Sequence, residues 1–239
     1  SAPFPHEAKR PDANTTNPPA PPGEPPGTGD KGPPPVPADP PKPNVGPRPV
    51  GVVMKVDPKI EPRRHFDHPN DTVALPDLNT GDRVTLTGKV RVLKLGSVNG
   101  KGIADASGLV AEEVVITGDL NNEARVLVNA PNGTVTVGGY VTGASKLTIT
   151  APGGTVTVEG SGRLSGGTLM AVTARRLAVK CPMSGNARAN VTLTAGGTLK
   201  LGLMEDGATV AYKKAAPNDP PPTVERGVIR GGARVVPVN

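Results

Sequence analysis

Residues 130–137 read APNGTVTV, and residues 151–158, 21 positions further along the chain, read APGGTVTV. Each segment alternates apolar and polar side chains after a turn that contains Gly. Because successive side chains of a β-strand point to opposite faces, this alternation predicts a strand with one buried face and not a helix. A near copy at a fixed spacing indicates an internal repeat, so the same spacing is expected in the rest of the body.

The repeat extends to both sides of this pair. Short strands that follow a turn recur at separations of 24, 21, 21, 21 and 22 residues, and a second strand precedes them, as in VTLT at 84–87 and LTIT at 147–150. The apolar pairs in register are Val90/Val92, Val114/Ile116, Val135/Val137, Val156/Val158, Leu177/Val179 and Leu199/Leu201. Such short strands bury an apolar face only when copies stack. The spacing predicts an all-β protein in which residues 83–212 form a right-handed parallel β-helix, or β-solenoid, of about six coils.

Proline divides the chain into an arm and a body. Eighteen of the 30 prolines lie in residues 1–50, and only three lie between residues 83 and 216. Residues 1–49 are therefore expected to form an extended arm in the polyproline II conformation. Residues 50–82 are predicted as one short strand followed by a polar connector, and residues 213–239 as a C-terminal extension.

Composition limits the core and the location. Aromatic residues make up 2% of the chain, so Val, Leu, Ile and Ala must fill thin, stacked layers. The single cysteine, Cys181, allows neither an intrachain disulfide nor a cysteine-rich zinc cluster, and it is interpreted as apolar filler. No run of 18 apolar residues exists, which predicts no membrane span. A first residue that is Ser favours export, hence an extracellular or cell-surface location, with the cytoplasm as the alternative.

Candidate chemistry is sparse. Enzymes built on right-handed β-helices cluster carboxylates on one strand face, whereas the carboxylates of this body are scattered among turns and the body contains no histidine. We therefore expect a non-enzyme with no catalytic residue and no cofactor. His65 and His68, with Asp67 and Asp71, offer ligand types for a metal, but they lie in a polar loop, and no metal site is predicted.

Basic residues suggest one binding surface. The formal net charge is +6. Arg175, Arg176, Lys180 and Arg188 fall within one coil and form a candidate patch for an anionic partner such as a cell-surface glycan. Nucleic acid is not expected as a partner, because no aromatic residues are interleaved with the basic ones.

The segment VVITGDLNNEARVLVNAPNGTVTVGGYVTG (114–143) resembles the core of bactofilins, a family of polymer-forming β-helical cytoskeletal proteins with proline-rich tails. The resemblance covers about half of the chain. It implies end-to-end polymerisation without a nucleotide, and it carries over no site residues. The period of 21–22 residues is longer than that of bactofilin coils, and the proline-rich arm is longer than is usual in that family.

A solenoid has two open ends with unpaired backbone groups, and two strand-like segments outside the predicted coils are candidates to cover them. These are VGVVMKV (50–56) and VERGVIRGGARVVPV (224–238), which are predicted to add strands to a neighbouring subunit. The assembly residues are Val50, Val52, Val53, Val56, Val224, Val228, Ile229, Val235 and Val236. In the alternative, both segments fold back and cap their own solenoid.

The expected function is that of a structural protein that assembles with copies of itself into an extracellular or cell-surface filament. Two alternatives remain open. One is a glycan-binding, adhesin-like β-helix module, and the other is a cytoplasmic, bactofilin-like scaffold.

Overall fold

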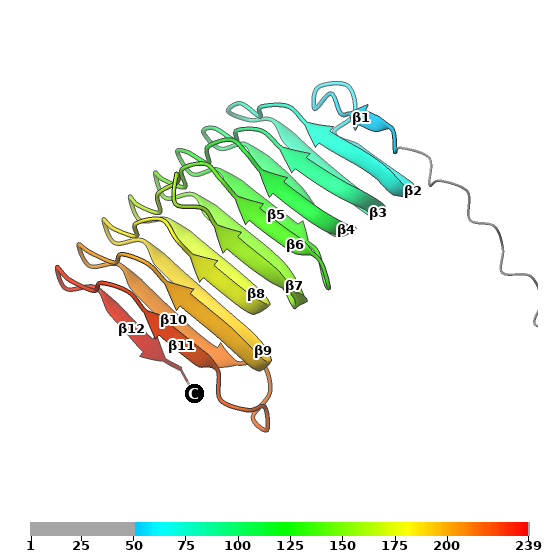
Figure 1. Cartoon of the computed structure of the whole chain (residues 1–239). Coiled ribbons are helices and arrows are strands. Elements are labelled where there is room, and N and C mark those ends of the chain that lie inside the picture. Colours follow the sequence, from blue (N-terminus) through cyan, green and yellow to red (C-terminus); the bar gives the residue numbers. More distant parts are fainter. Residues whose placement is uncertain (1–50, 239) are drawn as a thin grey trace, which may run out of the picture. The chain divides into compact units, whose positions relative to one another are not determined.

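The computed structural model describes residues 51–238; the predicted arm and Val50 lie outside them. Within this range the chain contains twelve strands and no helix. Ten of the strands follow one another in sequence order from β1 at one end to β12 at the other, and two short strands lie off this path (Figure 1). Their bounds are β1 Val53–Lys55, β2 Arg63–Leu75, β3 Arg83–Leu95, β4 Ile103–Ile116, β5 Arg125–Asn129, β6 Thr134–Val137, β7 Lys146–Val158, β8 Leu169–Val179, β9 Arg188–Leu201, β10 Thr209–Lys214, β11 Thr223–Arg226 and β12 Arg234–Pro237.

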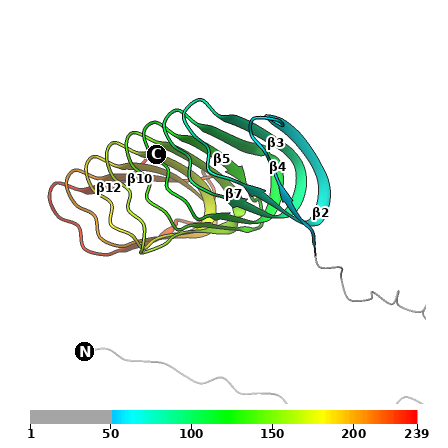
Figure 2. The same ribbon diagram turned by 90° about the horizontal axis from the view of Figure 1, so that it is seen from above.

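All pairings between these strands are parallel, and each coil stacks on the next (Figure 2). The predicted β-solenoid is thereby confirmed. Its coils have three sides, which we call A, B and C. Side A holds the segments that begin at Arg63, Arg83, Ile103, Arg125, Lys146, Leu169, Arg188, Thr209 and Arg234. Side B holds those that begin at Val53, Thr72, Val92, Glu113, Thr134, Thr155, Arg176, Thr198 and Thr223.

Side C is narrow and consists of one bridging residue per coil. The ladder runs through Leu78, Val98, Leu120, Val141, Leu164, Met183, Met204 and Ile229. With nine segments on each of sides A and B, the solenoid has about nine coils instead of the six predicted.

The additional coils come from both ends of the predicted range. Residues 63–75, which were predicted as part of a polar connector, form β2 and pair with β3 along most of their length. The C-terminal extension supplies β11 and β12. An inserted loop, residues 215–222, separates β10 from β11 and projects from the coils in Figure 1, which lengthens this coil and hides it from a search for a 21-residue period.

Inward-pointing apolar side chains stack in columns through the core. Val114, Val135, Val156, Leu177 and Leu199 lie in one column, as predicted. The next member toward the N-terminus is Leu93 and not Val90, which pairs with Ala111 instead. Leu93 and Val114 are 21 residues apart, so the irregular spacing of 24 arose from an alignment shifted by three positions. Outward threonines stack in the same way, with Thr134 beside Thr155 and Thr136 beside Thr157.

Each coil returns from side C to side A through a four-residue turn. The N–H of the fourth residue donates to the C=O of the first in all eight turns, for example from Gly102 to Asn99 at 3.1 Å. In six of the turns both central residues have φ between 51° and 76°. This is the signature of a type I′ turn, which Gly-Gly at 166–167 adopts without strain. Ala144, with φ of 59°, occupies the same position at a steric cost.

This geometry predicts that Ala144→Gly stabilises the solenoid. Relief of the left-handed strain gains about 1–2 kcal/mol, and the extra flexibility of the unfolded chain offsets about 0.5–1 kcal/mol. We expect the free energy of unfolding in urea to rise by about 0.5–1 kcal/mol. The control is Ala178→Gly in β8, where the backbone is extended and the same change should lower it by about 0.5–1 kcal/mol. An equal loss of unfolding free energy in both variants would contradict the conclusion that Ala144 is strained in its turn.

Candidate functional site

The two ends of the coil array are incomplete in opposite ways. At the N-terminal end, β1 covers β2 on side B, and the side A part of β2, Arg63–His68, has no strand beyond it within residues 51–238. At the C-terminal end, β12 covers β10 on side A, and β11 on side B is left uncovered among the described residues. The described coils therefore begin with a side B strand and stop after a side A strand. Both ends present strand edges whose backbone groups are available for pairing.

Side B of the N-terminal end presents apolar side chains to the core. Met54 points inward, in register with Val73, and Val56 is only 2% exposed. The outward neighbour of Met54, Val53, is 59% exposed. Residues 57–60 form a turn in place of a side C bridge. A hollow of about 690 Å³ remains beside this turn, and its charged lining residues are Lys55, Asp57, Lys59, Asp77 and Asp82.

Side A of the same end is screened by an arginine. Arg64 takes an inward position, in register with Leu86. Its guanidinium lies 5.0 Å from the centroid of the Phe66 ring and 2.6 Å from a carboxylate oxygen of Glu61. An inward charge at an edge strand disfavours pairing with unrelated strands, so Arg64 reduces the tendency of this uncovered end to aggregate.

The C-terminal end carries inward valines and a cluster of cations. Val224 and Val235 continue the core columns of Leu199 and Val210. On the outer surface of side B, Lys200 donates to Glu225 at 2.9 Å. This hydrogen bond, together with the charge of Glu225, raises the pKa of Lys200 above its usual value. The charged residues that follow Glu225 in the chain are Arg226, Arg230 and Arg234.

The residues predicted for assembly lie in these end coils. Val52 and Val53 are exposed at the N-terminal end, while Val228 and Val236 are exposed at the C-terminal end. Ile229 is the last bridge of side C. Both predicted segments pair with strands of their own chain, as the self-capping alternative expects. Val50 lies outside the described residues.

The predicted basic patch is not assembled by the fold. Arg176 lies on side B, whereas Arg188 begins a side A strand. Lys180 is engaged by Glu159 at 3.2 Å. Neighbours within one coil point to different sides of the solenoid, and it is residues one period apart that become neighbours in space.

Polar side chains reinforce side C from coil to coil. The N–H of Ser97 donates to the Asp77 carboxylate at 2.7 Å, and the N–H of Tyr140 donates to that of Asp119 at 2.8 Å. Asn121 donates to Asn99 at 3.2 Å and accepts from Thr142 at 2.8 Å. These contacts stabilise the stacking of successive coils.

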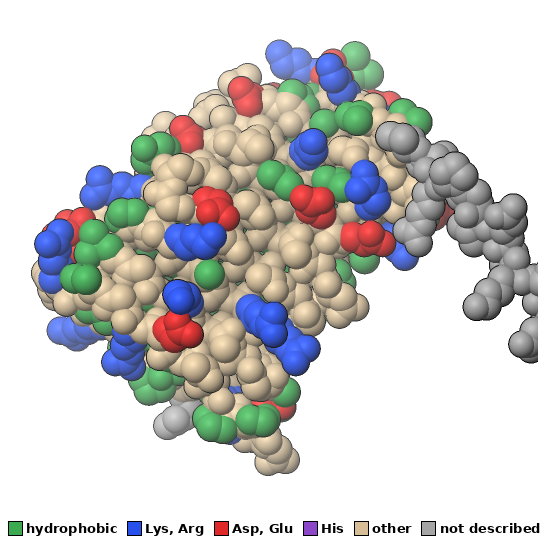
Figure 3. All heavy atoms as spheres, in the orientation of Figure 1, with side chains coloured by type: hydrophobic (Ala, Val, Ile, Leu, Met, Phe, Trp, Pro, Cys, Tyr) green, Lys and Arg blue, Asp and Glu red, His purple; other side chains and the backbone are tan. Residues whose placement is uncertain are grey.

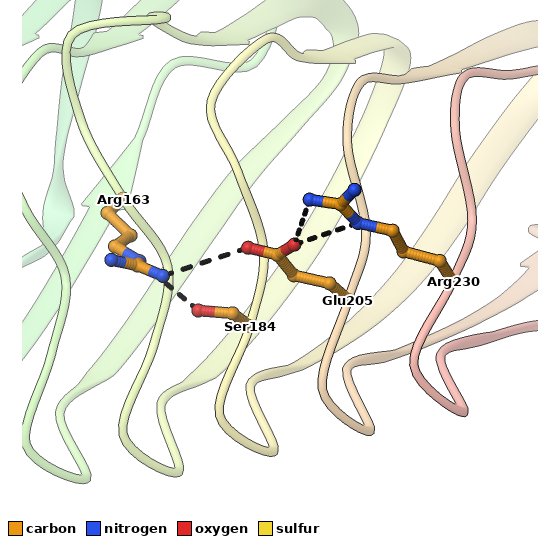
Figure 4. Close-up of polar contacts among 4 residues, drawn as sticks. All are labelled: Arg163, Ser184, Glu205 and Arg230. Carbon is orange, nitrogen blue, oxygen red and sulfur yellow. Dashed lines mark hydrogen bonds and ion pairs between the residues drawn. The ribbon is translucent and has the colours of Figure 1, made fainter.

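Near the C-terminal end, Glu205 is held between two arginines (Figure 4). Arg230 donates to its carboxylate at 2.8 and 3.1 Å, and Arg163, three coils away from Arg230, approaches it to 3.8 Å. Arg163 also donates to the Ser184 hydroxyl at 3.2 Å. The side chain of Glu205 is only 18% exposed, so this triad clamps the last coils together.

The histidines of the HFDH segment do not converge on a metal site. The ring of His65 lies 3.0 Å from the Thr87 hydroxyl, and that of His68 lies 3.5 Å from the Asp71 carboxylate. Among residues 51–238, no three His, Cys, Asp or Glu side chains are grouped to hold a metal ion. The same range contains no helix that is long and apolar enough to cross a membrane.

The fold and the end geometry define a parallel β-solenoid with two dissimilar, half-open ends. Comparison of the chain with protein-family models, with curated proteins and with solved structures finds no match in any of the three.

Cys181 is predicted to be unreactive in the folded protein. Burial raises the pKa of its thiol to about 11 from an ordinary 9.0, and the side chain is fully buried. Because only the thiolate reacts, the two-unit shift alone should slow labelling by an aromatic disulfide near pH 8 by about a hundredfold. Thr148→Cys, on the exposed face of β7 in a Cys181→Ala background, is the control and should label at an ordinary rate. Rapid labelling of native Cys181 would show that the core around this side chain opens in solution.

Proposed function

We propose that this protein is a non-enzymatic structural protein whose solenoids join end to end, the C-terminal end of one copy meeting the N-terminal end of the next. The observation that carries this proposal is the complementarity of the two half-open ends. Among residues 51–238, the last coil lacks a side B strand, and the other end supplies one, β1. In a junction between two copies, β12 and the β1 of the next copy therefore complete one coil.

The register within the chain defines the contacts of such a junction. On the outer surface of side B, one column of paired residues runs from Val53 in β1 to Thr223 in β11. At the junction, Val53 of the next copy would pair with Thr223 and continue this column. Val224 then stacks on Met54 in the core, and Glu225 lies beside Lys55 on the surface. On side A the corresponding column places Arg234 beside Glu61. Both surface pairs join opposite charges.

The distribution of exposed apolar side chains supports the same surfaces. Eight large apolar residues are exposed within residues 51–238, and six of them lie in the end coils. They are Val52, Val53 and Ile60 at the N-terminal end and Val228, Val236 and Val238 at the C-terminal end. Exposed apolar surface concentrated in this way is typical of a contact with another protein.

Joining unlike ends along the coil axis does not close into a ring, so each added copy leaves the same two ends free. Heterologous contacts of this kind produce filaments. The resemblance of residues 114–143 to bactofilins points in the same direction. The location outside the cell, and its cytoplasmic alternative, stay predictions.

The test places a charge at each end in turn. Met54→Glu and Val224→Glu each introduce a carboxylate at an inward junction position and should abolish polymers of the full chain in sedimentation and negative-stain microscopy. The matched controls, Thr136→Glu and Thr157→Glu, place the same carboxylate at outward positions of central coils, away from both ends, and should polymerise like the unaltered chain. Circular dichroism verifies that all four variants retain the solenoid.

A mixture of the two blocked variants tests the direction of joining. If unlike ends meet, each variant alone stays monomeric, and the mixture yields dimers, since each variant retains one intact end that fits the other. Dimers in either variant alone would show that like ends meet. An unaltered chain that stays monomeric at every concentration would reject assembly altogether.

A further inference from the structure

A row of cations runs along the edge of side A where each coil enters from the turn. One outward column passes through Arg83, Ile103, Arg125, Lys146, Leu169, Arg188, Thr209 and Arg234. Five of its eight members are basic, none is acidic, and all five basic side chains are exposed. We call these five residues, Arg83, Arg125, Lys146, Arg188 and Arg234, the basic row.

The charges of the basic row are not neutralised within the described chain. No ion pair or side-chain hydrogen bond joins any of the five to another residue among 51–238. Four carboxylates lie in the adjoining turns, at Asp82, Glu123, Glu205 and Asp206. Asp82 accepts from the N–H of Asn79 at 2.8 Å, and Glu123 lies 4.0 Å from Lys101.

The stacking of coils brings these like charges close together. Arg125 and Lys146 are in adjacent coils, about 4.8 Å apart along the axis, and the whole row spans seven coil spacings, or about 34 Å. Like charges directly opposite each other destabilise a sheet. An extended anion lying along the row would relieve this repulsion. Lys and Arg side chains are also the more numerous charges over the C-terminal coils in the face drawn in Figure 3.

Beside the basic row, side A is flat and largely uncharged. A second outward column, four residues further along each strand, presents amide and hydroxyl groups at Asn129, Thr150, Thr173 and Thr192 and continues to Lys213 in β10. This column lies about 13 Å from the basic row. Between the two columns, the outward residues from β5 to β10 are Leu127, Thr148, Ala171, Asn190 and Ala211, none of which is charged.

From this arrangement we propose that side A binds a linear, carboxylate-bearing polysaccharide that lies along the solenoid axis. The carboxylates contact the basic row, and hydroxyl groups of the sugars face the Asn and Thr column. The sugar unit of an extended polyuronate is close in length to one coil spacing, so its charges meet the row repeatedly. A single-stranded nucleic acid fits less well, because side A offers no aromatic ring in its outward columns from β3 to β9 on which bases could stack. This binding does not require joined ends.

The experiment measures binding of fluorescently labelled polygalacturonate, about ten residues long so that it spans the row, by fluorescence anisotropy. The variant carries Arg125→Gln, Lys146→Gln and Arg188→Gln, all distant from the junction surfaces. The control carries Lys94→Gln, Arg175→Gln and Arg176→Gln, which removes the same charge from outside the row. We expect the row variant to bind roughly tenfold more weakly or worse, with a shallower salt dependence, and the control to bind within about twofold of the unaltered chain.

Four results would overturn the proposal. The unaltered chain fails to bind polygalacturonate, or both triple variants lose affinity equally, which would indicate diffuse attraction to net charge. Methyl-esterified polygalacturonate binds as tightly as the acid, which would exclude carboxylate recognition. Single-stranded DNA of equal charge binds more tightly than polygalacturonate with the same dependence on the row, which would identify a nucleic acid as the ligand.

Discussion

Backbone pairing between successive coils is the interaction on which the rest of this structure depends. Each strand segment of sides A and B takes its partners from the coil before it and the coil after it, so one register is shared along the array. A slip of one residue in any coil would turn its apolar side chains outward. The same constraint leaves little room for large rings in the interior. Phe66, the aromatic residue buried in the described core, lies in the first complete coil, beside the open end.

The central part of the fold was predictable because its coils obey two rules at once, alternation within a strand and repetition every 21 residues. The outer coils break one rule or the other. β2 interrupts its alternation at Asp67–Asp71, and the coil after Met204 is lengthened to 25 residues by the loop 215–222. A signal for these coils was present in the turns, where Gly, Asn or Asp recurs at the positions of positive φ, as at Asp206-Gly207 and Gly231-Gly232.

The candidate sites were harder to predict, since proximity in sequence misleads in a solenoid. Arg176 and Arg188 belong to one coil, yet they lie on different sides of it. Arg125 and Lys146 are 21 residues apart and stand side by side. The ends pose a different difficulty. The sequence predicted that residues 224–238 form strands. Whether these strands pair with their own chain or with another depends on the number of coils that precede them. The sequence analysis underestimated that number.

The equal number of strands on sides A and B makes the described solenoid a whole number of coils long. Duplication or loss of one complete repeat would therefore change the length of the rod and leave both ends matched to each other. Gain or loss of a partial repeat would leave two identical half-coils facing one another. The near identity of APNGTVTV and APGGTVTV is what a recent duplication of one unit would leave behind. The number of coils can therefore change in steps of about 21 residues, whereas an insertion such as the loop 215–222 lengthens one coil and leaves the number of coils unchanged.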